Sequence, residues 1–192
     1  GVNTEGIEPI FNITPTSNIT SPDETSESLP QDGALQNAKN TDKPESPIRV
    51  VAASIGLDRA VVNPASTAVA VLDQELTKGA VRYPTSAMLG VEGTVLLFGH
   101  SSYLPVVYHQ YYKTFNAIQN LKKGEIVSVF SGATEYRYAV VNVRVADATE
   151  DVVELPATGK HLVLVTCATF SKKTSRFVVT ADFVGAYSLV PR

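Results

Sequence analysis

Short runs rich in β-branched and aromatic residues recur between turn residues from residue 48 onward, and this pattern limits the fold more than any other feature. A continuous apolar run at 94–98 predicts a strand buried on both faces. One helix is predicted over 112–121, because Phe115, Ile118 and Leu121 fall on one face. Many strands with one or two short helices predict an all-β fold, a closed or nearly closed barrel. The predicted strands are 48–54, 68–72, 94–98, 125–130, 135–145, 161–167 and 176–181.

The net charge of -3 hides an uneven distribution of charged residues. Residues 1–47 hold 8 acidic residues, 2 basic residues and 6 of the 11 prolines, whereas the remainder carries a net charge of +3. Such a segment has too little apolar surface to offset its ordering entropy, so 1–47 is predicted to be a linker or a weakly docked arm. Residues 48–188 are predicted to form the barrel. The end, 189–192 (Leu-Val-Pro-Arg), is interpreted as the remnant of a thrombin-cleavable tag.

Composition excludes several classes of protein. A sequence pI of about 5.6 without a basic stripe argues against nucleic-acid binding. One cysteine excludes an intrachain disulfide and a cysteine-rich zinc site. No run of 18 apolar residues is present, so the sequence as given is not expected to span a membrane.

The single thiol, Cys167, ends a predicted strand. A lone cysteine is commonly a buried, inert small hydrophobe. Here, however, a polar turn at 171–174 returns the chain to the next strand at Arg176, so the two strands are expected to be antiparallel neighbours. Cys167 and Arg176 would then lie at the same end. A guanidinium there favours the thiolate or donates hydrogen bonds to an oxyanion.

A thiol nucleophile also needs a base or an imidazolium partner. His161 opens the strand that Cys167 ends, roughly 20 Å away, and is rejected. His109 lies among tyrosines at the edge of the predicted helix and is assigned to packing or surface. His100 follows a buried strand, and Gly99 is expected to let the backbone turn and expose its ring.

Three segments in this order resemble the signature of the sortase family: 98–101 (Phe-Gly-His-Ser), 164–167 (Leu-Val-Thr-Cys) and 176–179 (Arg-Phe-Val-Val). The predicted first strand and the predicted helix-to-strand connection at 115–125 add to the resemblance, which covers about residues 47–186. It implies an eight-stranded β-barrel with the activity of a cysteine transpeptidase.

The resemblance also implies roles for the site residues. Cys167 would attack the Thr–Gly carbonyl of a Leu-Pro-x-Thr-Gly-like sorting signal. His100 would protonate the leaving amine and later deprotonate the incoming one, and Arg176 would stabilise the oxyanion or position the signal. Further candidates for contacts with the signal are Ser101, Thr166 and Ala168.

The implied partners are the sorting signal of a secreted protein and an amine on peptidoglycan or a pilin. The protein is expected to be extracytoplasmic and monomeric, with an N-terminal membrane anchor outside this sequence. No cofactor is required, although an acidic stretch could bind Ca²⁺ or simply be a solvated loop. Its residues are Asp147, Glu150, Asp151 and Glu154.

Two other functions remain open from the sequence. One is a sortase-like cysteine peptidase that mainly hydrolyses its substrate, and the other is a non-catalytic binding barrel. The arm lacks the Asp-Pro-aromatic tripeptide of pilus-type lids, so a lid of that kind is not predicted.

Residues 155–159 themselves read Leu-Pro-Ala-Thr-Gly, the general pattern of a sorting signal. They are interpreted as a loop between strands. The alternative hypothesis is recognition of this pentapeptide by a neighbouring molecule.

Overall fold

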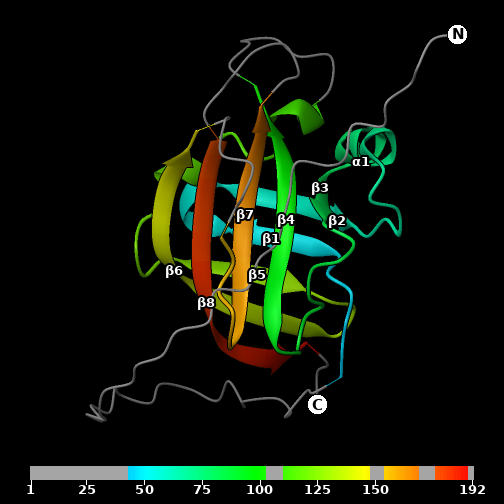
Figure 1. Ribbon diagram of the computed structural model, residues 1–192. Coiled ribbons are helices and arrows are strands. Elements are labelled where there is room, and N and C mark those ends of the chain that lie inside the picture. The colour runs from blue at the N-terminus through cyan, green and yellow to red at the C-terminus, as the bar shows by residue number, and fades with distance from the viewer. Residues whose placement is uncertain (1–42, 103–109, 148–153, 169–175, 190–192) are drawn as a thin grey trace, which may run out of the picture.

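A closed barrel of eight strands forms the protein in a computed structural model that describes residues 43–102, 110–147, 154–168 and 176–189. Around the barrel the strands follow the order β1-β2-β3-β4-β7-β8-β6-β5. The predicted all-β, eight-stranded barrel is therefore confirmed (Figure 1). The strands are β1 (Arg49–Ala52), β2 (Leu57–Val62), β3 (Ala80–Arg82), β4 (Gly93–Ser101), β5 (Ile126–Phe130), β6 (Thr134–Ala146), β7 (Lys160–Ala168) and β8 (Arg176–Ser188).

Most neighbouring strands are antiparallel, but β2 pairs with β3 and β4 pairs with β7 in parallel. Pairing of β1 with β5 closes the barrel. Figure 1 shows β4, β7 and β8 side by side. These three strands carry the residues predicted to form the active site.

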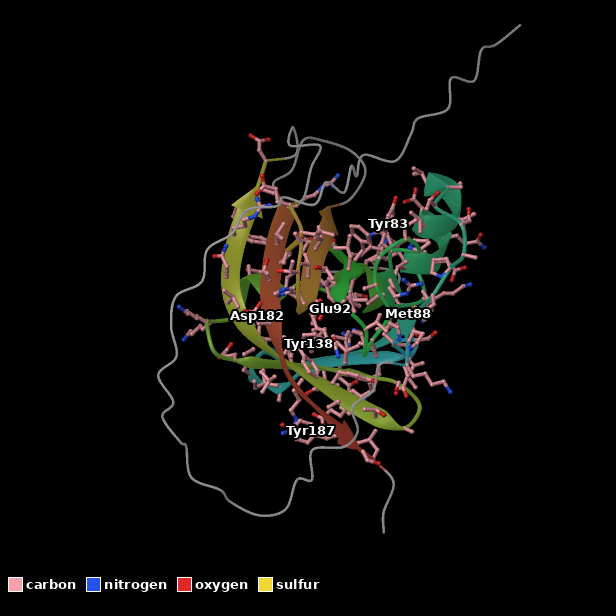
Figure 2. All side chains as sticks on the ribbon, turned by 60° about the horizontal axis from the view of Figure 1, so that its bottom comes forward. Tyr83, Met88, Glu92, Tyr138, Asp182 and Tyr187 are labelled. Carbon is pink, nitrogen blue, oxygen red and sulfur yellow. The ribbon has the colours of Figure 1, made fainter. Side chains whose placement is uncertain are left out.

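The strands β4 and β7, and residues 178–181 of β8, bury both of their faces. Side chains alternate along a strand, so successive residues point to opposite faces of the sheet. One face fills the barrel interior, and the other packs in a second buried cluster with Tyr83 (labelled in Figure 2), Leu155 and Leu76. Leu76 belongs to α1 (Val69–Leu76), the only α-helix among the described residues. The prediction that 94–98 is buried on both faces is confirmed. Interior residues are Val95, Leu97, Leu162, Leu164, Val179 and Ala181, and outer residues are Leu96, Phe98, Val163, Val165 and Val178.

The predicted strand at 68–72 is wrong, because these residues begin α1. The alternating Val69 and Val71 that indicated a strand are exposed. Burial is instead achieved by Leu72 and Leu76, which are four residues apart and therefore share one helical face.

The predicted helix at 112–121 is wrong in type. Two short 3₁₀ turns take its place, η2 (Gln110–Lys113) and η3 (Ile118–Asn120); a third, η1 (Ala53–Ile55), follows β1. Of the three apolar residues, only Ile118 lies in a 3₁₀ helix, whereas Phe115 lies in the turn between η2 and η3 and Leu121 directly follows η3. All three are buried in the interior cluster.

The last residues of the predicted arm contact the barrel. Glu45 exchanges backbone hydrogen bonds with Leu89, and its carboxylate accepts hydrogen bonds from the hydroxyls of Ser131 and the fully buried Tyr136. Residues 1–42 and 190–192 lie outside the described residues, so the boundaries 1–47, 48–188 and 189–192 remain predictions. Within the described ranges, every helix is too short or too polar to cross a membrane.

Candidate active site

The parallel pairing of β4 and β7 places His100 beside Cys167. The two strands run in register from Gly93 opposite Lys160 to Ser101 opposite Ala168, and His100 is the Cα partner of Cys167. Adjacent strands lie about 4.8 Å apart, so the backbones of these two residues are immediate neighbours.

Arg176 begins the strand on the other side of β7. The predicted antiparallel pairing of β7 and β8 is confirmed, with Val165 opposite Val178. Two residues further along this register, Arg176 reaches the level of Cys167. The Phe177 amide also donates a hydrogen bond to Thr166 Oγ1 at 2.8 Å, which fixes the two strand ends together.

The alternation of side chains assigns His100 and Arg176 to one face of the sheet. Phe98 and Val165 lie on the outer face, as does Val178. Position 100 follows Phe98 by two residues and position 176 precedes Val178 by two, so both continue the outer face at one rim of the barrel, where Cys167 is the Cα partner of His100.

His100 is buried rather than exposed. Its exposed fraction is 2%, and its ring centroid lies 5.2 Å from that of Tyr112. The expectation that Gly99 turns the backbone and exposes the ring is wrong, since Gly99 lies within β4. The glycine instead permits close approach of Phe115: a Cβ at position 99 would lie 2.5 Å from Phe115 Cγ. The Phe115 amide donates a hydrogen bond to the His100 carbonyl at 2.8 Å.

Asp73 on α1 is a candidate site residue that was not predicted from the sequence. It is half-buried, and burial raises the pKa of its carboxyl group, while the charge of His100 acts in the opposite direction. The two side chains are thus within electrostatic range across the contact between α1 and β4. A single aspartate carries no distinctive sequence signal, and residues 68–72, which directly precede Asp73, were predicted to be a strand.

The remaining candidates for contacts with the substrate are Ser101, Thr166 and Ala168. Ser101 and Ala168 are paired at the ends of β4 and β7, next to His100 and Cys167. Thr166 is 1% exposed, and its hydroxyl accepts the hydrogen bond from Phe177.

Of the other two histidines, the structure describes His161, which does not join this group. His161 lies at the opposite end of β7, with Nδ1 2.7 Å from Asp182 Oδ1 and Nε2 2.6 Å from the Thr158 carbonyl oxygen. His109 lies outside the described residues.

The suggested Ca²⁺ site is only partly described. Asp147 and Glu154 are placed, whereas Glu150 and Asp151 lie outside the described residues. Within the ranges that the structure describes, no three His, Cys, Asp or Glu side chains are grouped to hold a metal ion.

The pentapeptide 155–159 is built into the fold. Leu155 is buried in the outer cluster. The Thr158–Gly159 peptide bond is hydrogen-bonded at both ends, because the Thr158 carbonyl contacts His161 and the Gly159 amide donates to Glu92 at 2.9 Å. Figure 2 shows Glu92 and Asp182, which mark this end of the barrel.

We therefore expect the protein not to cleave itself between Thr158 and Gly159. Prolonged incubation of the purified protein at high concentration should leave its intact mass unchanged, because attack requires this peptide bond to leave its hydrogen bonds. A free peptide with the sequence Leu-Pro-Ala-Thr-Gly is the control and should be cleaved. A fragment ending at Thr158 would contradict this expectation.

Comparisons with known proteins agree with this architecture. The sequence model of the sortase domain matches residues 50–184. Sortase A of Bacillus anthracis is 30% identical over 115 residues, which cover 59% of this chain and 50% of that protein; the chain thus spans about half the length of this curated relative. Sortase A of Listeria monocytogenes is similar in structure, with a TM-score of 0.59 and 21% identity over 76% of this chain and 92% of that chain. Sortase E of Streptomyces avermitilis gives a TM-score of 0.57 and 22% identity over 75% of this chain and 91% of that chain.

Proposed function

The chain belongs to the sortase family, and we propose that it is a cysteine transpeptidase. In this proposal Cys167 is the nucleophile, His100 is the general acid and base, and Arg176 is the electrostatic partner. The observation that carries the proposal is the register of β4 and β7, which pairs His100 with Cys167. A nucleophile and its proton-transfer partner must lie this close to act on one substrate carbonyl.

The proposed reaction has two acyl-transfer steps. The Cys167 thiolate attacks the Thr carbonyl of the substrate, and a tetrahedral intermediate forms. His100 donates a proton to the amine of Gly as the carbon–nitrogen bond breaks, leaving a thioester on Cys167. An incoming amine then attacks the thioester, loses its proton to His100 and releases the thiolate.

The surroundings of His100 and Arg176 suit these roles. The His100 ring is enclosed against Tyr112, which limits its orientations. Arg176 carries a permanent positive charge at the beginning of β8, next to the end of β7. Such a charge favours the thiolate and stabilises the developing oxyanion.

We further propose a Leu-Pro-x-Thr-Gly-like sorting signal of a secreted protein as the substrate, with Ser101, Thr166 and Ala168 near the bound signal. The acceptor is an amine of peptidoglycan or of a pilin. The protein then works at the cell surface, held there by an N-terminal anchor. Family membership and the position of Ser101 and Ala168 beside the paired His100 and Cys167 support this assignment.

An assay with an added amine separates transpeptidation from its alternatives. A fluorogenic Leu-Pro-x-Thr-Gly peptide is incubated with increasing triglycine, and the products are identified by mass spectrometry. We expect the triglycine adduct to replace the free acid as triglycine rises. Free acid alone at saturating amine would identify a hydrolytic peptidase, and a peptide library without any cleaved member would indicate a non-catalytic binding barrel.

A further inference from the structure

The helix α1 lies to the side of the end of β4 at which His100 lies (Figure 1). Leu72 and Leu76 attach it to the outer cluster that contains Phe98. Phe98 and His100 are two residues apart on one strand, so they share that face. Asp73 follows Leu72 and lies one helical turn before Leu76, which places its carboxyl group at the edge of the same contact.

Titratable groups on α1, η2, β7 and β8 lie toward the end of β4 that carries His100. Asp73 on α1 interacts with it electrostatically. The second acidic residue of α1, Glu75, forms an ion pair with Lys78 at 2.8 Å instead. On η2, the ring of Tyr112 lies 5.2 Å from that of His100. On β7, Cys167 is the Cα partner of His100, and Arg176 begins β8 on the far side of β7.

The interaction between Asp73 and His100 is reciprocal. Burial raises the pKa of the Asp73 carboxyl group, and a positive charge on His100 lowers it. The same interaction makes the carboxylate stabilise the imidazolium form of His100. Because the ring is 2% exposed, water competes little for this role.

We propose that Asp73 is a positioning residue that holds His100 as an oriented imidazolium, ready to donate its proton to the leaving amine. The inference rests on the proposed function of His100 and extends it to a residue on a different element. Asp73 itself does not contact the reacting atoms.

The test is an NMR titration of the labelled His100 ring, with Cys167→Ala as the background so that the thiol does not titrate alongside. Asp73→Asn should lower the titration midpoint of His100 by about 0.5–1 pH unit, because a neutral amide no longer favours the imidazolium. Asp73→Glu should keep the midpoint near that of the parent. Glu75→Gln is the matched control on the same helix and should leave the midpoint unchanged.

In the active enzyme, Asp73→Asn should move the limb of the pH profile that reports imidazolium deprotonation to lower pH by a similar amount, with KM nearly unchanged. An unchanged midpoint in Asp73→Asn, or an equal shift in Glu75→Gln, would overturn the proposal. A shifted midpoint in a protein that cleaves no peptide would uphold the coupling and reject the proposed function, so the two failures are distinguishable.

Discussion

Cys167→Ala will reduce kcat/KM for cleavage of a Leu-Pro-x-Thr-Gly peptide by about a thousandfold or more, because no other group can carry the acyl chain in the proposed reaction. Product formation, measured by chromatography over long incubations, gives the ratio of kcat/KM between the variant and the parent. Alanine fits wherever a cysteine is accommodated, so the thermal unfolding midpoint should change little.

The matched control for this experiment is Val184→Ala. Val184 is 54% exposed on β8 and lies away from the rim that carries position 167. This variant should keep its activity within about twofold, as expected for a truncated exposed side chain. Residual activity of one tenth or more in Cys167→Ala would show that Cys167 is not the nucleophile.

Gly99→Ala will destabilise the protein by about 3 kcal/mol, a typical upper cost of overpacking. The added Cβ would lie 2.5, 2.6 and 2.9 Å from three ring atoms of Phe115. Phe115 is completely buried, and its amide is bonded to the His100 carbonyl, so relief of the clash must also move His100. Urea unfolding measures the loss of stability, and the peptide assay should show a loss of activity even where the protein remains folded.

Gly132→Ala is the matched control for Gly99→Ala. A Cβ at position 132 would meet no atom within 4 Å. Its free energy of unfolding should stay within about 0.5 kcal/mol of the parent. Equal stability of Gly99→Ala and Gly132→Ala would contradict the packing of Phe115 against β4.

Strands with long apolar runs could be predicted from sequence, because such runs satisfy burial on both faces. The apolar run 94–98 lies inside β4, and Cys167 and Arg176 fall near the ends of β7 and β8 as expected. The sequence did not show that β4 and β7 are neighbours. Parallel strands far apart in the chain are brought together by the closure of the barrel, which local patterns do not encode.

Short elements could not be assigned from their residues alone. Residues 68–72 alternate as a strand would, yet packing of Leu72 and Leu76 on the barrel favours a helix. Strand β3 has three residues, too few to show a period. Asp73 could be recognised only after α1 was placed against β4, since its electrostatic interaction with His100 depends on tertiary packing.

In the proposed reaction, Cys167 carries the acyl group as a thioester next to His100. The most direct test of this step is mass spectrometry of enzyme quenched with acid during turnover, followed by mapping of the modified residue. We expect a mass increase equal to the substrate up to its Thr residue, located on Cys167 and removed by hydroxylamine. An acyl group on any other residue, or turnover during which Cys167 stays unmodified, would contradict it.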